Sequence, residues 1–431
     1  MTQYTLHFEK KHEKKTNFLK PKHIFGSSFL TMTSFLQIPN GAHPLLKECV
    51  LHNVLPYLPL NSVLSAIVLS REFKTTALHC PFVRIGDSLS PDRARLCRVL
   101  RRFHHVARVH VENAELLSKS EDFEAFASVV PHVVDLSLTK LRLNRTTGGS
   151  FVQSFAQHLQ RLRILSLNGC MFPTADVLTE MVSHLNGRSL SFISLVGCRT
   201  LEDQHVNTLL SKCSTLTTLL LPDCTRLRRP NLVHGSLEEI DLSKCTSIEA
   251  FPQVRLPKVR TICLEWCRNL IASSIENIVR TSPSLISLEM GGCVAFHQLQ
   301  LSNGRSLETL RFGMCESIRT LRIENCPTLS NLHLGLCVGL NRLELINCPL
   351  LIDVDASLLS DLKGVHIERC VGMQSIDVTT TTEPPTVTLL PLSSQKENTK
   401  VIDECARLND PNCPGPGQSG VGTGMATKTV E

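Results

Sequence analysis

An eleven-residue pattern in the second half of the chain restricts the possible folds more than any other feature. Between Leu285 and Val378, apolar residues recur at the first, fourth and sixth positions of each copy, and cysteine recurs at the ninth. The copy from Leu329 to Cys337 reads Leu-Ser-Asn-Leu-His-Leu-Gly-Leu-Cys. Four positions held in phase over so many copies indicate a solenoid, in which similar strand-and-turn units stack along one axis.

The spacing between copies changes along the chain and predicts what covers the outer side. Early repeats are 26–29 residues long and contain helical patterns over residues 116–130, 201–212 and 271–280. Late repeats are 22 residues long and consist of two similar halves, each too short for a strand and a helix. We therefore expect an α/β solenoid over residues 100–378, with helices outside the early repeats and short outer strands after about residue 293. Its inner strands are expected to begin near residues 106, 133, 162, 190, 216, 237, 259, 285, 307, 329 and 351.

Most of the 18 cysteines follow the repeat and do not occur in closely spaced pairs. A small polar side chain at the ninth position can bond backbone groups in the turn, so we interpret these residues as buried, reduced thiols of a cytoplasmic or nuclear protein. A zinc site is the alternative, but the chain has no C-x-x-C pair, and cysteines in a row do not form a tetrahedron. We expect no metal and no cofactor. The ninth-position residues are Cys170, Cys198, Cys224, Cys245, Cys267, Cys293, Cys315, Cys326, Cys337, Cys348 and Cys370.

Positive charge is concentrated near the beginning of the sequence. Residues 1–23 hold six lysines against two glutamates, which is +4 of the formal net charge of +6. The nearly neutral remainder does not favour a nucleic-acid partner, and the sequence has no 18-residue apolar run that predicts a membrane span. Residues 1–40 and 379–431 are polar or of low complexity, so we expect disordered tails. A basic localisation signal is the alternative interpretation of the first tail.

Residues 44–90 have a different character from the repeats. Two amphipathic helical patterns run from Leu46 to Leu58 and from Leu60 to Val68. The stretch resembles an F-box, and the matching residues are Val54-Leu55-Pro56-Tyr57-Leu58-Pro59-Leu60, Val63-Leu64, Ile67-Val68-Leu69-Ser70-Arg71-Glu72-Phe73, Leu78 and Phe82-Val83-Arg84-Ile85. Phe73 stands where the family usually has tryptophan, and the family's opening Leu-Pro-x-Glu is scrambled. The alternative is a helical cap that shields the first repeat.

The repeats themselves resemble cysteine-containing leucine-rich repeats, and the whole chain resembles F-box/leucine-rich-repeat proteins. This resemblance implies the substrate-recognition subunit of an SCF-type (Skp/cullin/F-box) E3 ubiquitin ligase. It implies that an adaptor of the Skp family, and through it a cullin, docks on Leu55, Leu58, Pro59, Leu64 and Phe73. The alternative is a repeat scaffold that binds proteins without a ubiquitin-ligase role. The sequence has no nucleotide-binding, zinc-protease or serine-hydrolase motif, so we do not expect an enzyme.

The concave face of the sheet is the expected site for a protein target. The third, fifth and seventh positions point outward there, and neighbouring strands lie about 4.8 Å apart, so four acidic residues should gather beside the chain's single tryptophan. An aromatic side chain, acids and an apolar area together indicate a binding site for a segment that carries lysine or arginine. The alternative is a solvated face with incidental charges. The predicted target-binding residues are Phe192, Leu220, Glu239, Asp241, Glu265, Trp266, Glu289 and Arg311.

Overall fold

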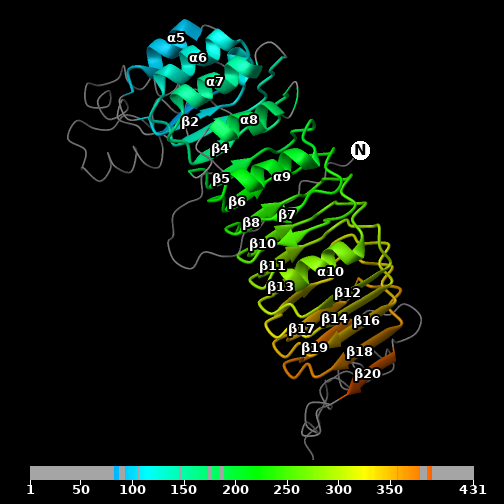
Figure 1. Ribbon diagram of the computed structural model, residues 1–431. Helices are drawn as coiled ribbons and strands as arrows, with labels where there is room; N and C mark the ends of the chain where they lie inside the picture. The colour runs from blue at the N-terminus through cyan, green and yellow to red at the C-terminus, as the bar shows by residue number, and fades with distance from the viewer. Residues whose placement is uncertain are drawn as a thin grey trace, which may run out of the picture.

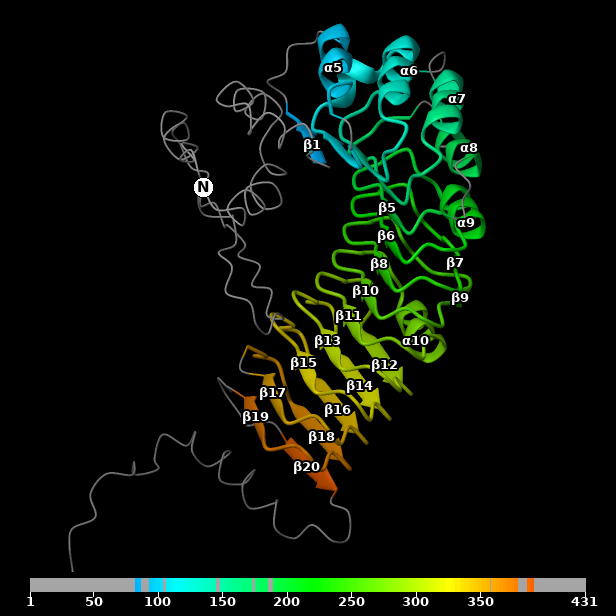
Figure 2. The ribbon, with the colours of Figure 1, turned by 90° about the vertical axis from the view of Figure 1, so that its left-hand side faces the viewer.

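The computed structural model describes residues 82–86, 93–103, 106–144, 148–172, 174, 176–184, 189–356, 358–378 and 386–390 of the chain. They form one curved stack of strand-and-turn units (Figure 1). A parallel sheet lines the concave side, while helices and further strands cover the outer side (Figure 2). The predicted fold, a leucine-rich-repeat solenoid, is confirmed.

The inner sheet has 13 strands, and each pairs in parallel with the equivalent residues of the next repeat. Eleven of these strands are the ones that the repeat predicts, and β1 and β19 extend the sheet at its two ends. The inner strands are β1 (Phe82–Ile85), β2 (Arg108–Val111), β3 (Asp135–Leu138), β4 (Ile164–Ser166), β5 (Phe192–Ser194), β6 (Thr218–Leu220), β8 (Glu239–Asp241), β10 (Thr261–Cys263), β11 (Ser287–Glu289), β13 (Thr309–Arg311), β15 (Asn331–His333), β17 (Asp353–Ala356) and β19 (Ser375–Val378).

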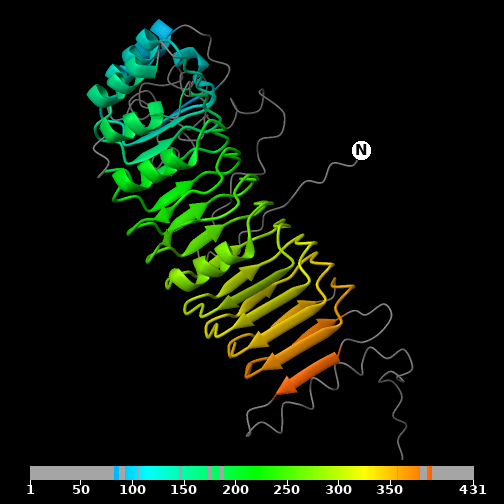
Figure 3. The same ribbon diagram turned by 45° about the vertical axis from the view of Figure 1, so that its right-hand side comes forward.

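The outer side changes from helices to strands along the chain, as the repeat length predicts (Figure 3). Within the described ranges, no helix is both long and apolar enough to cross a membrane. The helices are α5 (Arg93–Leu100), η3 (Ala114–Leu117, a 3-10 helix), α6 (Ser120–Val129), α7 (Gly148–His158), α8 (Asp176–His184), α9 (Asp203–Lys212) and α10 (Ala272–Thr281). A five-stranded outer sheet follows: β12 (Gln298–Ser302), β14 (Thr320–Glu324), β16 (Arg342–Ile346), β18 (Gly364–Glu368) and β20 (Thr386–Leu390).

Two outer strands occur earlier than expected. β7 (Leu232–Val233) and β9 (Val254–Arg255) pair with each other between α9 and α10. The repeats that begin at Leu216, Leu237 and Val259 are only 21 and 22 residues apart, so these two repeats are as short as the late ones. The local repeat length, and not the position in the chain, therefore decides whether a helix or a strand covers the outer side.

The core follows the repeat positions. Fourth- and sixth-position side chains, such as Ile262 and Leu264, are fully buried between the inner sheet and the outer elements. Under the first helices the filling is aromatic: the rings of Phe123 and Phe155 stack with centroids 5.1 Å apart, and Phe151 packs against both. Elsewhere the core is mostly aliphatic, as the low aromatic content requires.

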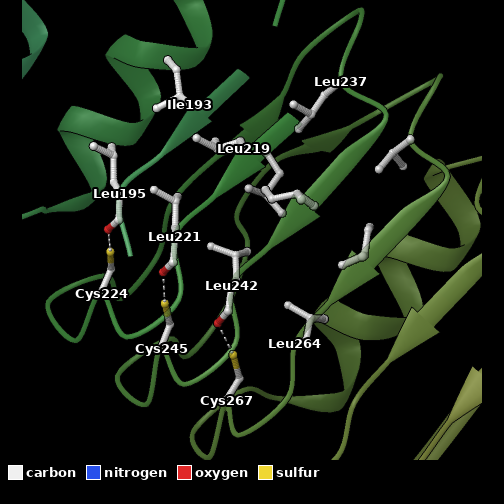
Figure 4. Packing of buried hydrophobic residues seen from close by; sticks show 14 of the residues in the cluster. Ile193, Leu195, Leu219, Leu221, Cys224, Leu237, Leu242, Cys245, Leu264 and Cys267 are labelled. Atoms are coloured by element: carbon white, nitrogen blue, oxygen red, sulfur yellow. Dashed lines mark hydrogen bonds between the residues drawn. The ribbon is translucent and has the colours of Figure 1, made fainter. Parts of the chain in front are cut away.

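The ninth-position cysteines connect consecutive repeats. The Sγ of Cys245 donates a hydrogen bond to the carbonyl oxygen of Leu221, the sixth residue of the preceding repeat, at 3.1 Å (Figure 4). The same bond recurs at 3.1–3.3 Å for seven successive ninth-position cysteines from Cys170 to Cys315. Burial raises the pKa of thiols such as Cys224 to about 12, which keeps the proton that the bond needs. The interpretation of these residues as buried thiols that bond turn backbone is confirmed.

The eighth position has a left-handed backbone in most repeats. Its φ is 61° at Lys244, 63° at Trp266 and 74° at Gly292. This conformation turns the backbone N–H along the stack, and the Trp266 N–H donates to the carbonyl oxygen of Gly291 in the next repeat at 2.6 Å. From Cys170 to Cys293, each turn is therefore bonded to the preceding repeat through a thiol and to the following repeat through an amide.

The expected boundaries of the solenoid are too narrow at both ends. Phe82–Ile85, assigned to the F-box-like unit, forms β1 and pairs with β2, because its alternating Val83 and Ile85 are buried as fourth- and sixth-position residues. At the other end, Thr386–Leu390 pairs with β18 inside the expected disordered tail. The other residues of the F-box-like unit, and both tails apart from β20, lie outside the described residues.

From the hydrogen bond between the Cys245 thiol and the Leu221 carbonyl oxygen, we predict the relative stabilities of two variants. Cys245→Ala leaves the Leu221 carbonyl oxygen without its donor in a buried site, so we expect a loss of about 1–2 kcal/mol in the free energy of unfolding. Cys245→Ser keeps a donor of similar size and should lose less. Urea denaturation followed by circular dichroism measures both. Equal stability of Cys245→Ala and the unchanged protein would contradict a stabilising role for this bond.

Candidate protein-binding face

The strand register brings charged fifth-position side chains together on the concave face. Asp241, Cys263, Glu289 and Arg311 are direct neighbours on β8, β10, β11 and β13. The Nε of Arg311 lies 3.8 Å from a carboxylate oxygen of Glu289, in a partly exposed pair. A surface pair of this length contributes little stability, so Arg311 offsets only part of the local negative charge.

Glu265 adds a third carboxylate from the seventh position after β10. A side-chain carbon at Gly291 would lie 3.6 Å from its Oε1, so the carboxylate reaches toward the next repeat. Partial burial raises the pKa of Glu265, and the carboxylates of Glu289 and Asp241 raise it further. We refer to Asp241, Glu265 and Glu289 as the acidic cluster. The three carboxylates repel one another, and a positively charged group of a bound partner would relieve this repulsion.

Cys263 lies within the acidic cluster and was not among the predicted site residues. It is the one cysteine among the described residues that is not fully buried. Desolvation raises its pKa, and the charges of Asp241, Glu265 and Glu289 add to this effect. The Cys263 thiol is therefore protonated and weakly nucleophilic at neutral pH, which does not favour a catalytic role.

Trp266 lies along the turn beside the acidic cluster and is half-buried. A side-chain carbon placed on Gly292 would come within 2.7 Å of the indole ring, so the ring rests on the bare backbone of the next repeat. The guanidinium of Arg268 lies 5.4 Å from the ring centroid, in reach of a cation–π contact. The expected eighth-position side chain outside the core is found, but it packs on Gly292 and does not project freely.

The other predicted target residues have varied positions. Phe192 and Leu220 are half-buried on β5 and β6, and Leu220 is the direct neighbour of Asp241. Glu239 is exposed at the third position of β8, next to Thr261, and thus lies two residues before Asp241 along the strand. The structure therefore brings Leu220 to the acidic cluster and leaves Phe192 and Glu239 at its margins.

The turns after β13, β15 and β17 expose a row of apolar side chains that were not among the predicted site residues. Met314, Leu336 and Leu358 occupy the eighth position of three consecutive inner repeats and are 43%, 45% and 54% exposed. Their strands are paired neighbours, so this row continues along the solenoid from Trp266 and Gly292. We name Trp266, Met314, Leu336 and Leu358 the apolar ridge. Their shared eighth position in the repeat is the sequence feature from which this row could have been predicted.

Three other possible kinds of site are an adaptor-binding surface, a metal site and a small-molecule pocket. The adaptor-binding residues predicted from the F-box resemblance (Leu55, Leu58, Pro59, Leu64 and Phe73) lie outside the described residues. Among the residues that the structure does describe, no group of three or more metal-binding side chains is present. A groove of about 480 Å³ lies at the N-terminal ends of the inner strands, opposite the turns that hold the ridge. It is lined by Lys258, Arg260, Glu308 and several hydroxyl groups. Such a polar lining is unlike the mostly apolar pockets that hold small molecules.

Comparison with known proteins gives limited similarity. No family model matches the chain, and no curated protein matches it. Among solved structures, it is similar to a chain in the crystal structure of the Rad7 and Elc1 complex in yeast, with 16% identity and a TM-score of 0.37 over 80% of this chain and 90% of that one. It is also similar to a chain of the TLR13–ssRNA13 complex, with 14% identity and a TM-score of 0.27 over 71% and 59%. Both TM-scores are low, so the fold assignment rests on the repeat geometry.

The Trp266–Gly292 contact predicts a non-additive pair of substitutions. Gly292→Ala places a side chain at a φ of 74° and also displaces the indole ring. The left-handed backbone alone should cost about 1–2 kcal/mol of stability. In a Trp266→Ala background the clash disappears, so Gly292→Ala should be less destabilising there. Chemical denaturation gives the four stabilities. Simple additivity would mean that the ring does not rest on Gly292.

Because Cys263 is the one partly exposed cysteine among the described residues, we expect a single, slow alkylation site in that part of the folded protein. Because its pKa is raised, we expect slow reaction with iodoacetamide at pH 7 and faster reaction as pH increases, whereas the buried ninth-position thiols react only after unfolding. Peptide mapping by mass spectrometry separates Cys263 from the cysteines outside the described ranges. Rapid modification of Cys263 at pH 7 would contradict the proposed influence of the acidic cluster.

Proposed function

We propose that this protein captures a protein target on the concave face of its solenoid, around the acidic cluster and Trp266. The observation that carries this proposal is the grouping of Asp241, Glu265 and Glu289 on three neighbouring repeats, with a half-buried tryptophan beside them. Long, regular inner sheets of solenoids provide extended binding surfaces. The carboxylates favour a target segment that carries lysine or arginine, and Trp266 supplies the apolar contact that usually dominates affinity.

We further propose that the captured target is presented to a cullin-type ubiquitin ligase. In this proposal residues 44–81 form the F-box-like unit, and Leu55, Leu58, Pro59, Leu64 and Phe73 contact an adaptor of the Skp family. The chain would then contribute recognition and no catalysis. Support for this step comes from the sequence resemblance, and the solenoid beginning at Phe82 would directly follow the adaptor-binding unit.

A scaffold without a ubiquitin-ligase role is the second candidate. One observation favours it: Phe82–Ile85, which the resemblance assigns to the closing element of the F-box, belongs to the inner sheet. The motif is therefore shorter than the resemblance implies. Both candidates keep the same target-binding face and differ only in the partner at residues 44–81.

Co-purification distinguishes the two candidates. With the full chain as bait, the ligase proposal expects a Skp-family adaptor in the eluate and its loss in Leu64→Asp. The exposed Leu350→Asp in the solenoid is the control, because it introduces the same charge far from the docking unit in sequence. Circular dichroism verifies that both variants fold. Unchanged adaptor recovery with folded Leu64→Asp, or no adaptor with the unchanged chain, would favour the scaffold.

Charge reversal tests the target-binding face. Asp241→Lys combined with Glu289→Lys should slow the association of a basic target and weaken its dependence on salt, because rim charges act mainly on the association rate. Trp266→Ala should weaken binding by about thirtyfold, since truncation of a central aromatic contact typically costs about 2 kcal/mol or more. Glu308→Lys, at the opposite edge of the sheet, is the matched control. Biolayer interferometry at several salt concentrations measures the rates. If target binding survives both changes, the face is wrongly assigned.

A further inference from the structure

The acidic cluster and the apolar ridge form one continuous surface along the solenoid. The acidic cluster lies on three neighbouring strands: Asp241 ends β8, Glu265 follows β10 and Glu289 ends β11. The exposed residues of the ridge follow the next three strands, β13, β15 and β17. From β8 to β17 there are five strand spacings, or about 24 Å at 4.8 Å each. The surface is thus about as long as eight extended residues, and a segment of twice that length has to bind it in a more compact conformation than a strand.

A strip of bare backbone lies beside this ridge. The seventh positions of three consecutive repeats are Gly291, Gly313 and Gly335. A side-chain carbon at Gly335 would lie 3.1 Å from the carbonyl oxygen of Phe312, so the turns approach closely there. The glycines thus allow the turns to stack closely and place no side chain beside the ridge.

The exposed ridge is a candidate contact surface for another chain. Met314 keeps a left-handed backbone at φ 55° with its side chain exposed, and Leu336 and Leu358 are equally accessible. Apolar side chains exposed in a contiguous row are unusual on a soluble surface and usually mark a contact. The occupant must combine positive charge for the acidic cluster with apolar side chains for the ridge.

Residues 10–25 of this chain have that combination in the required order. The segment reads Lys-Lys-His-Glu-Lys-Lys-Thr-Asn-Phe-Leu-Lys-Pro-Lys-His-Ile-Phe. Four lysines come first, Phe18 and Leu19 follow, and Ile24 and Phe25 end it after two further lysines, Lys20 and Lys22. By contrast, residues 391–431 hold four basic and five acidic residues and offer no charge complementarity.

The connecting chain is long enough for this contact. Residues 26–81 separate the segment from Phe82, the first residue of β1. The proposed contact extends to β17, which is eleven strand spacings from β1, or about 53 Å along the sheet. An extended chain spans about 3.3 Å per residue, so a small part of residues 26–81 covers the distance.

We propose that residues 10–25 bind across the concave face of the same chain, with Lys10–Lys15 at the acidic cluster and the apolar residues on the ridge. This inference deepens the proposed function, because it makes the segment a competitor for the target at the same face. It does not depend on the adaptor or on ubiquitin. A target then has to displace the segment, and its apparent affinity falls by the fraction of molecules in which the face is open.

The chain's single tryptophan reports on this contact in the full-length protein. In a variant with Phe18, Leu19, Ile24 and Phe25 all replaced by serine, we expect Trp266 emission to shift to longer wavelength and its quenching by acrylamide to increase. In a Met314→Ser and Leu336→Ser background, where the segment is already released, adding the segment substitutions should give no further increase. Emission and quenching that are identical in the unchanged chain and the segment variant would overturn the proposal.

A labelled synthetic peptide of residues 10–25 tests the same contact in trans by fluorescence anisotropy. It should bind the segment variant at least about tenfold more tightly than the unchanged chain, whose face is occupied. Leu336→Ser introduced into the segment variant should weaken peptide binding by about tenfold, whereas Leu350→Ser, equally exposed at the other edge of the sheet, should not. A peptide with its four apolar residues changed to serine controls for charge attraction alone.

The outcomes separate this inference from the proposed function. If the serine peptide binds as tightly as the natural one, the contact is only electrostatic and the ridge is not its site. If the peptide binds the unchanged chain and the segment variant equally, the segment does not occupy the face in cis. Concentration-dependent sedimentation of the unchanged chain would instead indicate that the segment binds a second copy, which also overturns the proposal. None of these results requires a target or an adaptor, so target capture is judged independently.

Discussion

The hydrogen bonds at the turns that hold Cys170 to Cys293 support the rest of the structure. The ninth-position thiol donates to the preceding repeat, and the eighth-position amide donates to the following one. Each repeat contacts mainly its neighbours, so the solenoid has no single central core and its stability is spread over successive interfaces. This explains why cysteine recurs so regularly: it is small, it tolerates full burial, and its proton remains in place because burial raises its pKa.

The same turn geometry produces the candidate binding face. Regular stacking places equivalent side chains of neighbouring repeats about 4.8 Å apart, so separate residues in the sequence become rows on the surface. Carboxylates at the fifth and seventh positions thus form the acidic cluster, and apolar residues at the eighth position form the ridge. At Trp266 and Met314 a left-handed backbone keeps the eighth-position side chain out of the core. A proposed target and the proposed N-terminal segment both use these rows.

Much of this architecture could be predicted from the sequence, because a solenoid repeats a local pattern. The positions of the core residues, the role of Cys245 and its equivalents, and the helices around residues 203–212 and 272–281 all follow from spacing alone. Prediction failed where the pattern was weak or shared with another motif. Phe82–Ile85 matched an F-box element as well as a strand, and only its pairing with β2 decided between them. Thr386–Leu390 was hidden in a low-complexity stretch.

The sequence by itself determined the fold, the inward and outward positions of each repeat and the presence of acids beside the only tryptophan, because these depend on residue spacing. The tertiary structure alone decided which of those acids interact, since that depends on strand register and on the reach of each side chain: Asp241, Glu265 and Glu289 surround Cys263, while Glu239 stands apart. It also decided that the Trp266 ring rests on Gly292 and that Met314, Leu336 and Leu358 remain exposed, because exposure depends on what the neighbouring turns leave uncovered.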